Sequence, residues 1–349
     1  MSAAYKGVGW NAFKKKFDLI LGGVILLFLV LFFAVGLALN PRFDVMILAM
    51  RATSTAAIAL LHFILFVGPM ARLDKRWLPL LYNRRHLGVT MFWLAFVHGA
   101  LATLYYHGMG SVNPIVSIFT TDAGLTMGSF PFQAFGFVAL CILFVMAATS
   151  HDFWLANLSA PVWKTLHMLV YLAYLLLVIH VSFGVLQAET HWGYAAVMGL
   201  GLLTVSGLHL GAGFKQRGID QEFTGESTEG FVKVCQLSDL VEDTPFSATI
   251  GGERVAVIRY EGDKVSAVSG VCQHQNGPLT EGKFVYGCLT CPWHGYQYKL
   301  DDGTSPPPFT EKIPVFEVKL KGEDVWVSEK PVGTGVSVEP AKVEGCCNE

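Results

Sequence analysis

Two short loops near the C-terminus carry one cysteine and one histidine each, as Cys272-Gln-His274 and, after sixteen residues, Cys291-Pro-Trp-His294. Two thiolates and two neutral imidazoles can hold a two-iron, two-sulfur cluster in which the cysteines bind one iron and the histidines bind the other. Tetrahedral zinc is the alternative, but zinc fingers place a cysteine pair before a histidine pair. One ligand of each kind in both loops favours the cluster. The ligand set therefore indicates an electron carrier.

The region around these loops, residues 222–330, resembles the Rieske ferredoxin family. The match is carried by Cys291-Pro-Trp-His-Gly-Tyr-Gln-Tyr298, followed by Asp302-Gly303 and by Pro306 to Pro308. The resemblance implies an all-β domain whose cluster ligands are Cys272, His274, Cys291 and His294. It also implies a soluble-ferredoxin type of domain rather than the quinol-oxidising subunit of cytochrome bc complexes.

That quinol-oxidising subunit has an extra disulfide between the two loops and a serine after the second histidine and glycine. This chain has Trp293 and Tyr296 at the corresponding positions of the second loop. Losing a disulfide and a hydroxyl donor near the sulfurs implies a potential at the low end of the Rieske range, which runs from roughly −150 to +300 mV. Cys288 is close to the second loop, but we expect it to be a buried thiol rather than a ligand.

The rest of the chain is apolar enough to indicate a membrane protein, since 52% of the 349 residues are hydrophobic. The first apolar run is longer than the hydrophobic part of a signal peptide, so we expect it to remain as an anchor. Runs of spanning length lie near residues 17–39, 45–69, 86–107, 131–149, 163–186 and 193–211. The sequence thus predicts a multi-domain membrane protein, with a six-helix transmembrane bundle and an all-β Rieske domain.

The same pattern predicts the order of the domains along the chain. The predicted parts are a cytoplasmic N-terminal segment at 1–16, the transmembrane domain at 17–214, a linker at 215–225, the Rieske domain at 226–330 and a flexible tail at 331–349. The tail ends in Cys346 and Cys347, for which lipidation or metal binding is the alternative to a disordered end.

Charge separates the two halves, with a net +8 for residues 1–219 and a net −10 for residues 220–349. Arginines and lysines crowd the loop between the second and third runs, whereas Gly108 to Phe130 contains none. By the positive-inside rule both termini, and hence the cluster domain, are predicted to be cytoplasmic. An inner-membrane protein with an acidic cluster domain would receive electrons from a cytoplasmic reductase or ferredoxin. We expect no nucleic-acid partner.

Histidines inside membrane spans are costly and are usually functional. His98 and His180 lie in the third and fifth runs and should reach a similar depth, because both helices run outward. Imidazoles on facing helices can hold haem b as an axial pair, and the alternative for His98 and His180 is an imidazole bonded to a helix carbonyl. His86 and His167, near the inner ends of the same runs, are candidates for a second haem, with an interfacial position as the alternative for His86. For the other span histidines, His62, His107 and His209, we favour structural roles over a quinone or third-ligand role.

Residues 43–211 resemble the ferric reductase-like transmembrane family, on Arg84-Arg85-x-Leu-Gly and on Trp163-x-x-Leu-His167-x-x-Val-Tyr171. The nearest resemblance is to the haem-bearing membrane subunit of the bacterial periplasmic methionine sulfoxide reductase system. It implies haem ligation by His98, His167 and His180. It also implies that Arg51, a charge within the second run, meets a haem propionate.

Many members of that family end in a flavin and nicotinamide domain, whereas this chain has a Rieske module in that place. We therefore expect electrons to pass from a cytoplasmic donor through the [2Fe–2S] cluster to intramembrane haem b. The acceptor would be a periplasmic oxidoreductase, ferric iron, oxygen or a quinone. The alternative is a haem-free membrane anchor that tethers a Rieske ferredoxin for a cytoplasmic oxygenase or reductase.

Overall fold

The structure is a computed structural model. It describes residues 12–77, 80–81, 83–120, 131–151, 153–154, 158, 160–188, 192–219, 227–274, 277–292, 295–307 and 309–343. The predicted ligand His294 and the tail residues Cys346 and Cys347 lie outside the described residues. The chain divides into a helical unit that ends at Leu210 and a second unit that begins at Gly211 and contains all the strands.

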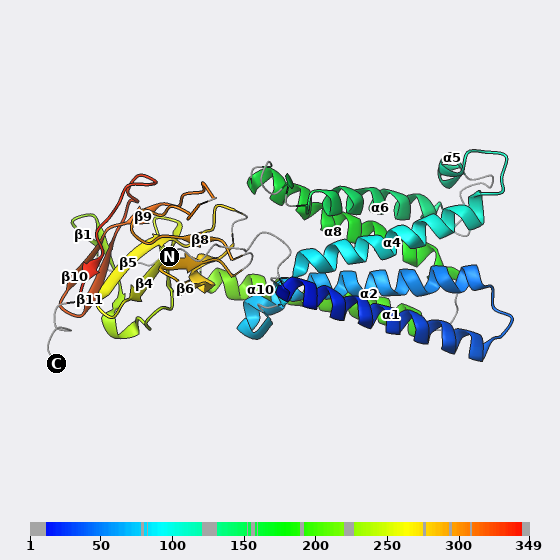
Figure 1. The fold of residues 1–349 in the computed structure, drawn as a ribbon, viewed down its shortest axis with the longest axis horizontal. Coiled ribbons are helices and arrows are strands. Elements are labelled where there is room, and N and C mark those ends of the chain that lie inside the picture. The colour runs from blue at the N-terminus through cyan, green and yellow to red at the C-terminus, as the bar shows by residue number, and fades with distance from the viewer. Residues whose placement is uncertain are drawn as a thin grey trace. The chain divides into compact units, whose positions relative to one another are not determined.

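Long apolar helices make up the first unit (Figure 1). They are α1 (Ala12–Leu39), α2 (Val45–Leu73), α4 (Arg84–His107), α6 (Phe132–Ala148), α8 (Ala160–Phe183) and α10 (Trp192–Ile219), with the short elements η1 (Lys75–Trp77), α5 (Pro114–Phe119) and α9 (Val185–Ala188) between them. The start of α2 is capped by the Asp44 carboxylate, which accepts the backbone N–H groups of Met46 and Ile47 at 2.7 and 3.3 Å. Such a cap satisfies donors that the first helical turn leaves without partners.

Five of the described helices are long and apolar enough to cross a membrane. The chain is therefore a multi-pass membrane protein, as its sequence predicts. The remaining long helix, α6, is equally apolar but has only 17 residues. At 1.5 Å per residue it is about 25 Å long, which is close to the lower limit for a span.

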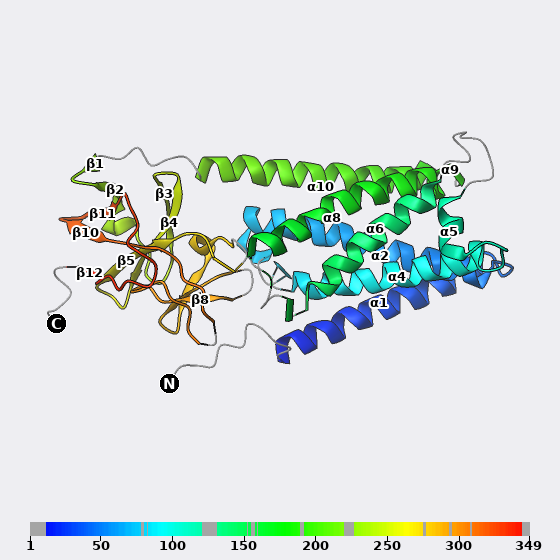
Figure 2. The same cartoon turned by 90° about the horizontal axis from the view of Figure 1, so that it is seen from above.

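The helical core forms where α2 packs on α4 and α6 packs on α8, as both views of the bundle show (Figures 1 and 2). Leu61 and Leu65 of α2, Leu87 of α4 and Ala173 of α8 are almost completely buried there. Large apolar side chains such as Trp93, Phe144 and Leu175 are exposed on the outer surface of these helices. An outward apolar surface is expected for a bundle whose solvent is lipid.

Beyond the end of α10, the described residues of the second unit form an all-β domain with three small antiparallel sheets. Strands β1 (Ser227–Thr228), β2 (Phe231–Gln236), β11 (Asp324–Ser328) and β10 (Val318–Lys321) form one sheet. Strands β12 (Ala341–Lys342), β5 (Lys264–Ser269), β4 (Glu253–Tyr260) and β3 (Phe246–Ile250) form the second, with β9 (Val315–Phe316) also on β5. The third contains β6 (Lys283–Val285), β7 (Cys288–Thr290) and β8 (Gln297–Tyr298), preceded by the short helix η4 (Leu279–Glu281).

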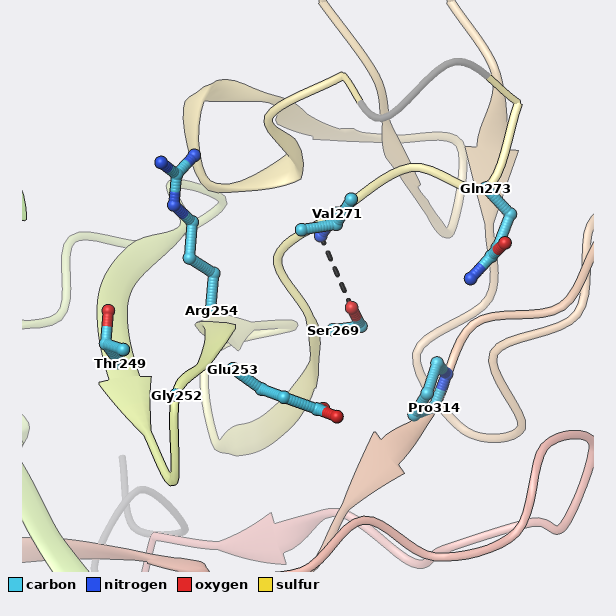
Figure 3. Close-up of a pocket in the computed structure, with 8 residues that line it drawn as sticks. All are labelled: Thr249, Gly252, Glu253, Arg254, Ser269, Val271, Gln273 and Pro314. Carbon is cyan, nitrogen blue, oxygen red and sulfur yellow. Dashed lines mark hydrogen bonds between the residues drawn. The ribbon is translucent and has the colours of Figure 1, made fainter. Parts of the chain in front are cut away.

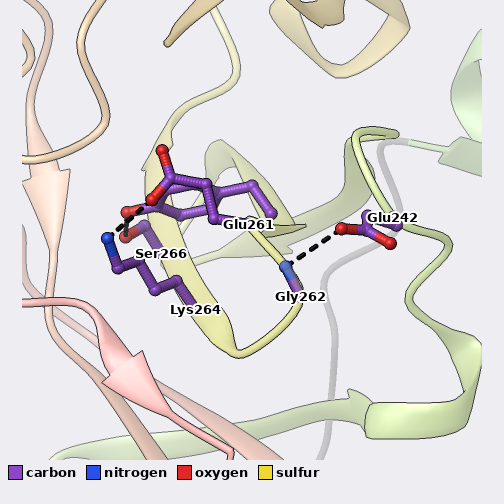
Figure 4. A network of polar contacts seen from close by, with 6 residues as sticks. Glu242, Glu261, Gly262, Lys264 and Ser266 are labelled. Carbon is purple, nitrogen blue, oxygen red and sulfur yellow. Dashed lines mark hydrogen bonds and ion pairs between the residues drawn. The ribbon is translucent and has the colours of Figure 1, made fainter. Parts of the chain in front are cut away.

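The turn between β4 and β5 shows how local sequence fixes the strand register. Glu261 and Gly262 both have positive φ, 51° and 80°, within the three-residue loop between the paired residues Tyr260 and Lys264. Short hairpin loops of this kind often need such left-handed conformations. The Gly262 N–H donates to the Glu242 carboxylate at 2.9 Å, and Lys264 pairs with Glu261 at 2.6 Å (Figure 4). These polar contacts hold the outer end of the hairpin.

The folded β unit extends to Val343, so the boundary predicted at residue 330 falls inside it. Strand β12 pairs with β5, the Val332 N–H donates to the Val315 carbonyl at 2.8 Å, and the Val343 N–H donates to Asp263 at 2.8 Å. Val338 and Val343 pack against the two hydrophobic cores of the domain. The described part of the predicted tail is thus a strap on the β domain.

Candidate functional site

The first ligand loop connects β5 to η4. The Cys272 N–H donates to the Gly277 carbonyl at 2.9 Å, which closes the loop behind the cysteine. At the base of the loop, the Gly270 N–H donates to the Arg254 carbonyl at 2.7 Å. A side chain at Gly270 would lie 2.8 Å from Thr280, so the close approach of these segments requires glycine.

The second ligand loop connects β7 to β8. The Cys291 N–H donates to the Tyr296 carbonyl at 2.7 Å, and the Gly295 N–H donates to the Cys291 carbonyl at 2.9 Å. Gly295 has φ of 70°, a conformation that glycine adopts without strain. The two hydrogen bonds hold the Cys291 backbone against Gly295 and Tyr296.

Three of the four predicted ligands are described, and all three are buried. Cys272, Cys291 and His274 are 1, 2 and 7% exposed, and both cysteines belong to one hydrophobic cluster with Leu279 and Leu289. The His274 ring stacks on Tyr296 at 4.0 Å between centroids. Soft thiolates and an imidazole in an apolar surrounding are a donor set suited to an iron–sulfur cluster.

Among the described residues no group of three His, Cys, Asp or Glu side chains is placed to hold a metal ion, and the fourth predicted ligand, His294, lies outside those residues. Thiolates and imidazoles can hold either a [2Fe–2S] cluster or zinc, so the preference for the cluster rests on the order of the ligands in the two loops.

The hydroxyl of Tyr298 is a functional group that sequence reasoning missed. It lies 3.3 Å from the Cys272 sulfur and accepts the Gln273 N–H at 3.2 Å. Burial, followed by the nearby Cys272 sulfur, raises the pKa of Tyr298, so its hydroxyl stays protonated and can donate to the sulfur. The final tyrosine of the second motif was the available signal, but its partner is 26 residues away in the chain.

Cys288 is a buried thiol in β7, 7% exposed, and burial raises its pKa. Cys235 in β2 behaves in the same way, with burial and then Asp239 raising its pKa to about 12. Cys288 lies in β7, outside the second ligand loop, and its role as a buried thiol rather than a ligand stays a prediction.

A surface pocket of about 650 Å³ opens beside the first ligand loop (Figure 3). Val271 and Gln273, the residues on either side of Cys272, line it together with Glu253 and Arg254 of β4. The pocket thus lies against the backbone that carries Cys272.

In the helical unit, the structure brings His98 of α4 and His180 of α8 together. Their ring centroids are 6.4 Å apart. Two metal–nitrogen bonds of about 2 Å each, extended to the ring centres, give roughly the same separation. The His98 Nδ1 lies 3.1 Å from the Met50 carbonyl and the His180 Nδ1 lies 2.9 Å from the Phe132 carbonyl. Since carbonyls only accept, each Nδ1 carries the proton and each Nε2 remains for a metal.

His167 and His86 are not brought together in this way. The His167 Nδ1 lies 3.0 Å from the Trp163 carbonyl, and its Nε2 lies 3.3 Å from the Ser150 hydroxyl. His86 is paired with Asp18 of α1 at 2.8 Å, and its Nε2 is buried with no hydrogen-bond partner in the described part of the chain.

Arg51 lies in α2, with its guanidinium carbon 5.2 Å from the centroid of the Phe43 ring.

The other span histidines are occupied at both ring nitrogens. His62 and His209 each place Nδ1 on the carbonyl four residues earlier and Nε2 on a tyrosine hydroxyl, from Tyr174 and Tyr171 respectively. His107 contacts the Ser117 hydroxyl and the Gln133 side chain. The Nε2 atoms of these three histidines have side-chain hydrogen-bond partners, whereas the contacts of His98 and His180 with backbone carbonyls are at Nδ1. Such partners are compatible with the structural roles expected for His62, His107 and His209.

Comparison with known proteins finds a family match in the helical part and another in the β domain. Residues 53–178 match the model of the ferric reductase like transmembrane component, and residues 230–317 match that of the Rieske [2Fe-2S] domain. The ferredoxin subunit of anthranilate 1,2-dioxygenase from Burkholderia cepacia is 32% identical over 95 residues, which are 26% of this chain and 85% of that protein.

Two further relatives match the same region. The cholesterol 7-desaturase of Xenopus laevis is 40% identical over 94 residues, which are 26% of this chain but only 20% of that protein. The chain spans about a fifth of the length of the cholesterol 7-desaturases that it matches. The solved ferredoxin of carbazole 1,9a-dioxygenase from Nocardioides aromaticivorans IC177 is 28% identical, with a TM-score of 0.28, over 29% of this chain and all of that one.

The buried cysteine loops thus lie in the region that matches the Rieske domain, and the apolar helix bundle contains the region that matches the ferric reductase-like component. The Rieske domain supports a [2Fe–2S] cluster, and the helical part makes the chain a multi-pass membrane protein. The chain belongs to the Rieske [2Fe–2S] family through its C-terminal domain, which is fused to a ferric reductase-like transmembrane domain.

Proposed function

We propose that this chain carries electrons across the cytoplasmic membrane, from a soluble cytoplasmic donor through the Rieske domain to haem b held by His98 and His180. The observation that carries the proposal is the facing of these two imidazoles, 6.4 Å apart, with both Nε2 atoms left for iron. Bound haem would supply a one-electron carrier within the bilayer.

The residues around the two histidines support this role. Met50 and Phe132 fix the tautomers through their carbonyls, as outer partners of metal-bound histidines usually do. Gly136 of α6 leaves room for the His180 ring, because a Cβ there would lie 2.6 Å from Nδ1. A wider side chain at that position would push the imidazole out of place.

The donor and the sidedness are inferred from charge and from relatives. Matched Rieske proteins include a ferredoxin subunit of a dioxygenase and a ferredoxin bound to its oxygenase, so a protein partner is expected at the cluster loops. The crowded arginines and lysines of the loop between α2 and α4 favour a cytoplasmic position for the Rieske domain. A periplasmic oxidoreductase is one acceptor consistent with this arrangement.

A visible spectrum of the purified chain tests the proposal. We expect split α and β bands of low-spin haem b after dithionite reduction, and we expect His180→Ala to abolish them. His151→Ala, at an exposed histidine outside the long helices, is the matched control and should keep the bands. Cluster-replete protein without haem bands would contradict the proposal and would instead support a haem-free anchor for a Rieske ferredoxin.

A further inference from the structure

His107, the last residue of α4, joins two other elements of the helical unit. Its Nε2 lies 2.7 Å from the Gln133 Oε1 of α6, and its Nδ1 lies 2.8 Å from the Ser117 hydroxyl of α5. The amide oxygen can only accept, so Nε2 carries the ring proton and the Ser117 hydroxyl donates to Nδ1. The ring therefore binds α5 through one nitrogen and the first turn of α6 through the other.

The first turn of α6 has no cap of the kind that begins α2. Its N-cap residue is Pro131, whose side chain has no polar atom, whereas Asp44 caps α2 through its carboxylate. A helix end without a side-chain cap leaves backbone N–H groups without partners and frays more easily. Gln133, the second residue of α6, is fixed to α4 by His107 instead. This side-chain bond restrains a turn that its own cap does not.

The same turn carries the contacts that place His180 of α8. The His180 Nδ1 lies 2.9 Å from the Phe132 carbonyl, and the centroids of the two rings are 5.5 Å apart. A Cβ at Gly136 would lie 2.6 Å from the same Nδ1, and a Cβ at Gly184, just after α8, would lie 2.9 Å from the Phe132 ring. A shift of this turn would therefore move the hydrogen-bond partner of His180.

The corresponding partner of His98 needs no such tie. The His98 Nδ1 lies 3.1 Å from the carbonyl of Met50, which is 5% exposed and lies in the second turn of the capped helix α2. Phe132 is instead the first residue of α6. The orientation of His180 thus depends on a helix end, and His107 is the side chain that holds this end to α4.

We propose that His107 and Gln133 are positioning residues for haem. They hold the first turn of α6, and the Phe132 carbonyl of that turn holds Nδ1 of His180. The inference rests on the proposed function and adds two residues outside the ligand set. An outer hydrogen-bond partner fixes the orientation of a metal-bound imidazole and its strength as a ligand. His107 keeps the structural role expected for it, and this role is directed at His180.

Substitutions on the two sides of the His107 ring test the inference. Gln133→Leu keeps a side chain of similar size and removes the bond to Nε2, whereas Ser117→Ala removes only the bond to Nδ1 and is the matched control. Two properties of the purified full-length variants are measured. One is the largest g value of the oxidised haem in electron paramagnetic resonance, which depends on the angle between the imidazole planes. The other is the rate of haem transfer to apomyoglobin.

We expect Gln133→Leu to shift the g value and to speed haem transfer by about tenfold, because it frees the outer partner of His180. Ser117→Ala should have wild-type values. His107→Leu should reproduce the effects of Gln133→Leu, and His107→Gln, which retains a side-chain N–H donor, should reverse them. The Rieske signal of the reduced samples shows that each variant is folded in its other domain.

Each outcome decides between the alternatives. A wild-type g value and transfer rate in Gln133→Leu and His107→Leu would overturn the inference and leave the proposed function standing. Equal changes in Ser117→Ala and Gln133→Leu, or no recovery in His107→Gln, would also overturn it, because His107 would then tie the helices together without acting through Phe132. Wild-type protein without haem bands would overturn the proposed function itself.

Discussion

The hydroxyl of Tyr298 lies 3.3 Å from the sulfur of Cys272 and is held there by the backbone N–H of Gln273. The pair joins β8 to the first ligand loop and places a protonated donor beside a predicted cluster thiolate. Hydrogen bonds to ligand sulfurs raise the potential of iron–sulfur centres. The sequence placed Tyr296 where the quinol-oxidising subunit has a serine, and the loss of that hydroxyl was expected to lower the cluster potential. The hydrogen bond from Tyr298 offsets part of this expected lowering.

Tyr298→Phe should lower the cluster potential and leave the cluster in place. A hydrogen bond worth about 1 kcal/mol corresponds to a shift of about 40 mV for a one-electron couple. A redox titration followed by electron paramagnetic resonance measures the shift. Tyr286→Phe, at an 83% exposed tyrosine of the same small sheet region, is the matched control. An equal potential in Tyr298→Phe and wild type would show that the hydroxyl does not act on the sulfur.

The ligand assignment predicts that substitutions at Cys288 and Cys291, two buried cysteines three residues apart, have different effects on the cluster. Cys291→Ser should abolish the Rieske resonance signal, because a thiolate ligand is lost from an apolar pocket. Cys288→Ser should keep the signal, since that thiol lies in β7 rather than in the ligand loop. Iron content of both purified variants checks the same point. Loss of signal in Cys288→Ser would mean that the second loop is assigned incorrectly.

Gly136 should be required for haem binding although it offers no ligand. A methyl group there would lie 2.6 Å from the His180 Nδ1, so the ring must move and lose its bond to the Phe132 carbonyl. Disturbing an outer partner of a metal ligand typically weakens binding by about tenfold or more. Haem content per protein after mild dialysis measures the effect.

Gly207→Ala is the control for this substitution, because no atom lies within 4 Å of a Cβ placed at that glycine of α10. It should retain the wild-type haem content. If Gly136→Ala also retained it, the position of His180 in this structure would not be the one that holds haem.

The number of haems depends on His86. Its Nδ1 pairs with Asp18 of α1 and its Nε2 is buried without a hydrogen-bond partner in the described part of the chain, but among the described residues no histidine ring is in contact with it as His180 is with His98. We therefore expect one haem per cluster and full haem content in His86→Gln. Pyridine haemochrome assay, compared with iron and sulfide analysis, gives the ratio. Two haems in the wild type and one in His86→Gln would instead make His86 an axial ligand oriented by a carboxylate.

The sequence predicted those features that depend on local composition. Ligand types and order in the cysteine loops predicted the cluster site, and apolar length predicted the spans, although α6 is shorter than a typical one. A shared helix direction predicted that His98 and His180 would be at equal depth. What it could not predict were contacts between distant segments, such as Met50 with His98 or Tyr298 with Cys272. The strap at 331–343 was missed because its polar, proline-containing sequence has no strand pattern.

In the proposed function, electrons reach the haem by way of the Rieske domain. This route is tested by the rate at which a soluble ferredoxin reductase with NADH reduces the haem of the purified chain, compared with Cys272→Ala. We expect haem reduction in the wild type and none by this donor in the variant, with dithionite still reducing the haem in both. Equal reduction by the soluble donor in wild type and Cys272→Ala would show that electrons do not pass through the Rieske cluster.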